Sequence, residues 1–132
     1  MLFIISFTKV NNGEQPFQYD SIERLIVVPS VPLNLSAQKT VTVPDVSVLL
    51  SWDCPESDGG LPITGYVVLY RDVTTSSWVC AGRTDAATRC RRVSRLVEHS
   101  ECLFRVAADN DVGRSDWSTS VRVKFTCGAQ YS

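Results

Sequence analysis

Residues 46–71, VSVLLSWDCPESDGGLPITGYVVLYR, limit what this 132-residue chain can fold into more than any other stretch. In their first part every second residue is large and apolar: Val46, Val48, Leu50 and Trp52. A period of two is that of a β-strand with one buried face. Pro55 ends this strand because proline has no N–H to donate, and Gly59-Gly60 suits a tight turn. The stretch therefore predicts two antiparallel strands around a sharp turn, with Trp52 in the core.

Further strand patterns follow at intervals of about ten residues, separated by turn signals. The expected strands cover residues 33–37, 46–53, 66–71, 77–82, 88–96, 101–110 and 118–125. No part of the chain shows a convincing helical period. Seven short strands of this kind predict an all-β protein, a seven-stranded antiparallel β-sandwich.

The segments outside these strands predict a simple domain organisation. We expect residues 1–28 to be a linker or a disordered N-terminal extension, residues 29–126 to form the domain, and residues 127–132 to be a C-terminal tail. Within the first segment, residues 22–28 are apolar enough to form a short strand, to dock along an edge, or to end a preceding domain. The apolar start of the chain is too short for a signal peptide or a membrane span.

Charge and cysteine content bear on the cellular setting. The formal net charge of −1 gives no overall attraction to nucleic acid or to an anionic membrane, and we expect neither nucleic-acid binding nor membrane insertion. Five cysteines cannot all pair with one another, which favours reduced thiols that act as small apolar residues in the cytoplasm. One disulfide with free thiols left over stays open as an alternative. The triplet Asn34-Leu35-Ser36 is a glycosylation acceptor if the chain is extracellular.

Candidate catalytic and ligand-binding groups are few. His99 is the only histidine and lies in a predicted turn, so a turn residue is favoured over a general base. The acidic group Asp53, Glu56 and Asp58 lies in a short loop that Pro55 interrupts, which does not suit calcium. The arginines lack interleaved aromatic residues of the kind that stack on bases. We therefore predict no catalytic residue, no metal site, no cofactor and no small-molecule substrate.

A candidate binding surface comes from strand parity. If the tyrosines of residues 66–70 and the apolar residues of 102–108 face the core, the residues between them face outward. Two neighbouring strands would then present one apolar patch with arginines at its edge. The tentative protein-binding set is Val67, Leu69, Arg71, Leu103, Arg105 and Ala107. Scattered apolar surface residues are the plain alternative, whereas a contiguous patch more often marks a partner or a neighbouring domain.

Several motifs in order carry a resemblance to a known family. They are Pro29-x-x-Pro32, Ser47-Val48-x-Leu50-Ser51-Trp52, Asp58-Gly59-Gly60-x-Pro62-Ile63-Thr64-Gly65-Tyr66, Trp78, Leu96-x-Glu98 and Phe104-Arg105-Val106-x-Ala108-x-Asn110-x-x-Gly113-x-Ser115. Across about residues 29–125 the chain resembles a fibronectin type III domain, and it is similar to the modules of titin, twitchin and myosin-binding protein C. The resemblance implies an immunoglobulin-like sandwich in which strands one, two and five face strands three, four, six and seven.

Two positions depart from the family pattern. Cys102 stands where the family usually has a tyrosine that ties the corner before strand six, and His99 stands where it has a glycine. The loss of the tyrosine hydrogen bond implies a corner that is less stable by about 1 kcal/mol.

The resemblance implies a non-catalytic structural spacer and protein–protein interaction module. The host class that it implies is a multidomain muscle or cytoskeletal protein in the cytoplasm, with other proteins and neighbouring domains of the same chain as partners. The alternative is a module of an extracellular cell-adhesion protein or receptor ectodomain.

Overall fold

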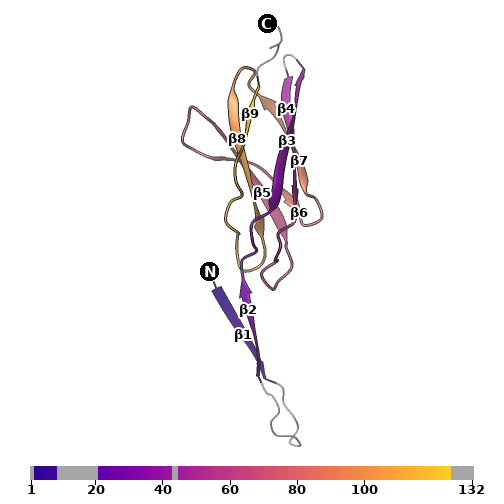
Figure 1. Cartoon of the computed structure of the whole chain (residues 1–132), viewed down its shortest axis with the longest axis vertical. Helices are drawn as coiled ribbons and strands as arrows, with labels where there is room; N and C mark the ends of the chain where they lie inside the picture. The colour runs from indigo at the N-terminus through magenta and orange to yellow at the C-terminus, as the bar shows by residue number, and fades with distance from the viewer. Residues whose placement is uncertain (1, 9–20, 43–44, 126–132) are drawn as a thin grey trace, which may run out of the picture.

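The computed structural model describes residues 2–8, 21–42 and 45–125, and these contain nine strands. Their bounds are β1 Leu2–Thr8, β2 Ser21–Val27, β3 Leu33–Thr42, β4 Asp45–Asp53, β5 Gly65–Asp72, β6 Val79–Asp85, β7 Cys90–Leu96, β8 Glu101–Asp109 and β9 Val121–Lys124. Strands β3 to β9 form the body of the molecule, and β1 and β2 form a separate antiparallel pair at one end of it (Figure 1).

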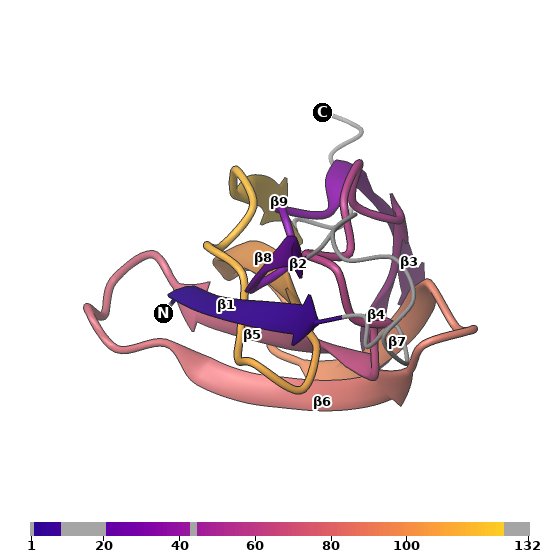
Figure 2. The same cartoon turned by 90° about the horizontal axis from the view of Figure 1, so that it is seen from below.

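The body is a sandwich of two antiparallel sheets. The smaller sheet has the strand order β3-β4-β7, and the larger has the order β6-β5-β8-β9. Seen along the long axis, the strands of the two sheets lie on either side of a shared interior (Figure 2). This arrangement confirms the predicted all-β immunoglobulin-like fold and the predicted division of its seven strands between two sheets.

The core contains the residues that strand parity predicts to face inward. From β4 and β5 these are Val46, Val48, Leu50, Trp52, Tyr66 and Val68, and from β8 Cys102, Phe104, Val106 and Ala108. The Trp52 ring meets the Tyr66 ring edge-on, with centroids 5.5 Å apart, and joins the two sheets. Burial of these apolar and aromatic side chains is the main favourable contribution to folding.

The corner before β8 is tied in a way that the sequence did not reveal. His99 adopts a φ of 69°, as expected for a residue that replaces glycine. Its amide donates to the Phe125 carbonyl at 2.6 Å, and the Phe125 amide donates to the Ser100 carbonyl at 2.8 Å. The Ser100 hydroxyl donates to the Val97 carbonyl within the same turn. These bonds hold the corner in a chain that has Cys102 in place of the family's tyrosine.

His99→Gly is expected to raise the free energy of unfolding by about 0.5–1 kcal/mol. The left-handed backbone costs a non-glycine residue about 1–2 kcal/mol, and the greater freedom of glycine in the unfolded chain cancels part of the gain. Urea denaturation measures the change. His99→Ala is the control, because it removes the imidazole and keeps the strain; equal stability of the two variants would contradict the assignment.

The prediction for residues 1–28 needs correction. Residues 2–8 and 21–27 are strands rather than linker, paired from Leu2 with Val27 to Thr8 with Ser21. A strand within residues 22–28 was one of the expected alternatives; Ile26 is buried, and the Val27 amide donates to the Gly59 carbonyl at 2.8 Å. Residues 9–20 and the predicted tail, residues 127–132, lie outside the described residues.

The cysteines do not all behave as small apolar residues. Cys54, Cys80 and Cys90 are exposed, and only Cys102 among the described cysteines is buried. All four are free thiols. Burial raises the pKa of the Cys102 thiol, and the negative charge of Asp72 raises it further. Among the described cysteines, the prediction that they act as apolar core residues holds for Cys102 alone.

Alkylation of the native protein with iodoacetamide at neutral pH is expected to modify Cys54, Cys80 and Cys90 and to leave Cys102 unmodified. The thiolate is the reactive form, and Cys102 is both inaccessible and held protonated by its raised pKa. Peptide mass mapping gives the modification at each site. Urea-unfolded protein, in which Cys102 reacts as fast as the others, is the control; rapid native labelling of Cys102 would contradict its placement.

Candidate protein-binding site

The six residues predicted to form a binding face lie together on the outer face of the larger sheet. Pairing of β5 with β8 aligns Val67 with Ala107, Leu69 with Arg105, and Arg71 with Leu103. The residues that alternate with them along the strands, such as Tyr66 and Val68, point the other way and lie in the core. The predicted assignment of faces is therefore confirmed.

The predicted apolar patch, however, is partly covered. Val67 is 3% exposed and Ala107 is 0% exposed, so neither offers apolar surface to a partner. The side chain of Arg83 on β6 reaches Asp109 on β8, and β5 lies between these two strands. Gly65, which pairs with Asp109, has no side chain to obstruct this crossing. The ion pair between Arg83 and Asp109 thus spans the width of β5 on this face.

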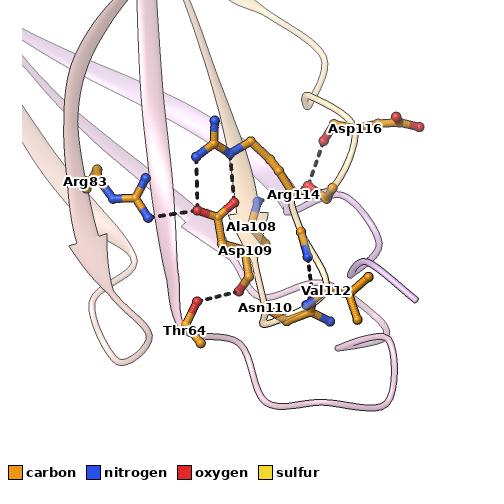
Figure 3. A network of polar contacts seen from close by, with 10 residues as sticks. Thr64, Arg83, Ala108, Asp109, Asn110, Val112, Arg114 and Asp116 are labelled. Atoms are coloured by element: carbon orange, nitrogen blue, oxygen red, sulfur yellow. Dashed lines mark hydrogen bonds and ion pairs between the residues drawn. The ribbon is translucent and has the colours of Figure 1, made fainter. Parts of the chain in front are cut away.

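Asp109 is the polar centre of this face. Its carboxylate accepts from the Arg83 guanidinium at 2.9 Å and from Nε and Nη2 of Arg114 at 2.8 and 3.2 Å (Figure 3). Its main-chain carbonyl accepts from the amide of Thr64 at 2.8 Å. The hydrogen bond to Asp109 raises the pKa of the Arg114 guanidinium. One carboxylate therefore holds two cationic side chains in place over the sheet.

A row of arginines and tryptophans extends from this centre across the sheet. The Arg71 guanidinium carbon lies 5.4 Å from the centroid of the Trp78 ring, and that of Arg105 lies 3.9 Å from the same ring. Arg105 also lies 4.9 Å from the Trp117 ring, and Arg114 lies 5.7 Å from it. We call Arg71, Trp78, Arg105, Trp117 and Arg114 the arginine–tryptophan row. Such cation–π contacts fix the guanidinium groups in place.

Aromatic residues interleaved with the arginines were not expected from the sequence, but the fold brings Trp78 and Trp117 to Arg105. The contact of Trp78 with Arg71 follows from strand register rather than from a sequence motif. The register between β5 and β6 pairs Tyr70 with Val79, and one further step places Trp78 beside Arg71 on the outer face. Trp117 lies outside the strands, after β8, and no periodicity of the sequence indicates that it folds back toward Arg105.

The row has more positive than negative charge. Burial lowers the pKa of the Arg105 guanidinium, and the like charge of Arg71 lowers it further. In the part of the chain that the structure describes, neither Arg71 nor Arg105 has a carboxylate within 4.0 Å; Arg71 donates instead to the Thr75 carbonyl. Two cationic groups on this face are therefore left without an anionic partner.

A second polar cluster lies where the chain enters the sandwich. The Asn110 side-chain nitrogen donates to the carbonyls of Val27 and Asp58, both at 2.8 Å. Its side-chain oxygen accepts from the amides of Val112 and Gly113 at 2.8 and 3.1 Å. We call these four hydrogen bonds the Asn110 clamp. They join the entering segment to two loops of the domain.

Glycine is required beside this clamp. Gly59 has a φ of 82°, and a Cβ atom there would lie 2.1 Å from the Val27 carbonyl oxygen. Further along the entering segment, the Ser30 amide donates to the Ser57 carbonyl at 3.0 Å, and the Ser57 amide donates to the Ser30 hydroxyl at 3.0 Å. The entering segment is therefore packed directly on the backbone of the 57–60 loop.

The residues considered for chemistry are engaged in local structure. The imidazole of His99 lies 3.5 Å from the Glu98 carboxylate in an exposed turn. The Asp58 carboxylate accepts from the Gly60 amide at 2.8 Å and shapes the loop. Asn34 is exposed, and its side-chain nitrogen donates to the Asp53 carboxylate at 2.8 Å.

Neither a metal-ligand group nor a membrane-spanning helix occurs among the described residues. No three His, Cys, Asp or Glu side chains gather there in a way that would hold a metal ion. The same residues include no helix long and apolar enough to cross a bilayer.

Comparison with known proteins decides the family. A model of the fibronectin type III domain matches residues 30–124. The chain belongs to the fibronectin type III family. Among solved structures, domains A168–A170 of titin match this fibronectin type III chain with a TM-score of 0.66 and 27% identity, covering 80% of this chain and 37% of that one. The motif-based resemblance is confirmed.

The curated relatives of this fibronectin type III chain include muscle proteins. Titin of Drosophila melanogaster is 41% identical over 93 residues. These residues make up 68% of this chain and, to the nearest whole number, 0% of that very long protein. Fast-type myosin-binding protein C of Gallus gallus is 35% identical over 111 residues, which is 79% of this chain and 10% of that protein. The chain thus spans a tenth or less of these two relatives.

Proposed function

We propose that this chain is a non-catalytic spacer and protein–protein interaction domain of a multidomain muscle or cytoskeletal protein. The observation that carries the proposal is the path of the chain through the sandwich. It enters at one pole through β2, which the Asn110 clamp fastens, and β9 runs toward the opposite pole (Figure 1). A module with its entry and exit at opposite poles extends the distance between its neighbours.

Two further observations support the proposed host class. The relatives include titin and myosin-binding protein C, and this chain matches only a small part of each. In addition, the exposed thiols of Cys54, Cys80 and Cys90 suit a compartment that keeps cysteines reduced. The proposed partners are other proteins and the neighbouring domains of the same chain.

The proposed binding face is the outer face of the larger sheet. Leu69 and Leu103 are partly exposed there, and Arg71 and Arg105 lie beside them. Val67 and Ala107 belong to the same face but act as its buried floor. Arginine and tryptophan are enriched at the centres of protein interfaces, which favours this face over the smaller sheet.

Replacement of Leu69 and Leu103 together by serine is expected to weaken partner binding and to leave the sandwich folded. Both side chains are on the outer face, so the core is not opened. The measurement is the striated localisation of the tagged chain expressed in muscle cells, and the double variant is expected to become diffuse. Leu49→Ser, on the outer face of the smaller sheet, is the control and keeps the striated pattern.

Either of two results would contradict the proposal. The first is a diffuse distribution of the unsubstituted chain in muscle cells. The second is intact-mass evidence, from the natively purified protein, for a glycan on Asn34 or for a disulfide. That result would favour the extracellular alternative, for which the exposed Asn34 side chain is the one structural argument.

A further inference from the structure

The arginine–tryptophan row leaves partly exposed cationic groups without a carboxylate partner. With Arg83, the row carries four guanidinium groups, and Asp109 accepts from two of them. Arg71 and Arg105 have no ion-pair partner in the part of the chain described. The Nε atom of Arg105 is buried and has no acceptor, so its remaining N–H groups are the ones available to a ligand.

We propose that this row binds an acidic segment of a partner protein, with its Asp or Glu carboxylates on Arg71 and Arg105. The inference rests on the proposed function, because it names the chemistry of the partner at the proposed binding face. Guanidinium groups held by indole rings are pre-oriented for carboxylates, so little side-chain freedom is lost on binding.

The spacing of the row favours a polypeptide over a single phosphate. Successive arginines contact successive rings, since Arg71 and Arg105 meet Trp78 while Arg105 and Arg114 meet Trp117. The positive groups are thus spread along a line instead of converging on one point. Alternate side chains of an extended segment recur about every 7 Å on one face, which suits such a line. Leu69 and Leu103 add apolar contact between the charges.

The test is an NMR titration of the full chain with a 16-residue peptide of alternating glutamate and alanine. The indole N–H signals of Trp78 and Trp117 are expected to shift, while that of the buried Trp52 stays in place. Affinity is expected to fall severalfold when the salt concentration is raised from about 50 to about 200 mM, because the contacts are ionic. Absence of binding at the lower salt concentration would overturn the inference.

The matched variants separate a specific site from general charge. Arg71→Gln with Arg105→Gln is expected to weaken binding at least about tenfold, and Arg71→Gln alone about threefold. Arg92→Gln removes the same charge from β7 of the other sheet and is expected to change affinity by less than about twofold. An equal loss with Arg92→Gln would overturn the inference. The single Arg71 variant keeps the test decisive if the double variant does not fold.

Two other anionic probes complete the design. A peptide of equal length with phosphoserine in place of glutamate, and vesicles that contain phosphatidylserine, are titrated in the same way. Tighter binding of either probe than of the glutamate peptide would overturn the assignment to carboxylates. A chain that keeps its striated localisation yet ignores the glutamate peptide would contradict this inference alone, whereas a diffuse distribution of the unsubstituted chain contradicts the proposed function.

Discussion

Trp52→Ala is expected to lower the free energy of unfolding by about 3–5 kcal/mol, the usual cost of removing a large aromatic side chain from a packed core. Trp52 is 3% exposed and its ring meets the Tyr66 ring at 5.5 Å, so its loss leaves a cavity between the two sheets. The indole nitrogen has no hydrogen-bond acceptor, so the stabilisation comes from apolar burial and ring contact. Chemical denaturation followed by circular dichroism gives the change.

Trp78→Ala is the matched control for this prediction. It removes the same side chain from the outer face of the sandwich, where the ring contacts arginines instead of the core. The expected loss is about 1 kcal/mol, the order of cation–π contacts at exposed sites. If Trp52→Ala cost no more than Trp78→Ala, Trp52 would not be the residue around which the two sheets pack.

Asn110→Ala is expected to lower the free energy of unfolding by about 2–3 kcal/mol and to release the entering segment. Asn110 is 6% exposed, and its four hydrogen bonds satisfy two carbonyls and two amides. Truncation of the side chain to alanine leaves these partly buried groups without hydrogen-bond partners. The free-energy cost of the unsatisfied groups exceeds the net contribution of the hydrogen bonds to stability. Denaturation gives the stability change, and trypsin cleavage within residues 21–30 reports release of the segment.

Asn110→Asp separates the two halves of the clamp. Aspartate has nearly the same shape and still accepts from the amides of Val112 and Gly113, but an ionised carboxylate cannot donate to the carbonyls of Val27 and Asp58. This variant is therefore expected to keep the 110–113 loop and to release the entering segment, with faster trypsin cleavage near Arg24. Unchanged cleavage in both Asn110 variants would show that the clamp does not hold the segment.

The core could be predicted from sequence because it follows from local periodicity, whereas the division of the strands between two sheets was implied by the resemblance to fibronectin type III domains. Alternation alone places Val48, Trp52 and Phe104 on the buried faces of their strands. Because successive side chains point to opposite faces, only one face of each strand can place its apolar residues against the other sheet. The same reasoning correctly placed Leu69 and Leu103 outside. It could not predict how long side chains from other strands lie across that outer face.

The remaining features depend on contacts between residues far apart in the chain. Val67 is buried although it lies on the outer face, and the Arg83 side chain crosses β5 to reach Asp109; no periodicity encodes either feature. The Asn110 clamp likewise joins two residues 83 positions apart, Asn110 and Val27. Such contacts arise only after the sheets have set the distances between loops. The position of the proposed binding face on the larger sheet was therefore predicted from strand parity, but the contacts across that face were not.

Amide hydrogen exchange of Val27 and Ser30 tests most directly whether the entering segment belongs to the rigid module. Their amides donate to the carbonyls of Gly59 and Ser57 at 2.8 and 3.0 Å. We predict exchange at least about a hundredfold slower than in an unstructured peptide, because opening requires release of the clamp. Exchange of both amides at the unstructured rate, with β4 still protected, would contradict the account of this domain as a spacer with a fixed entry.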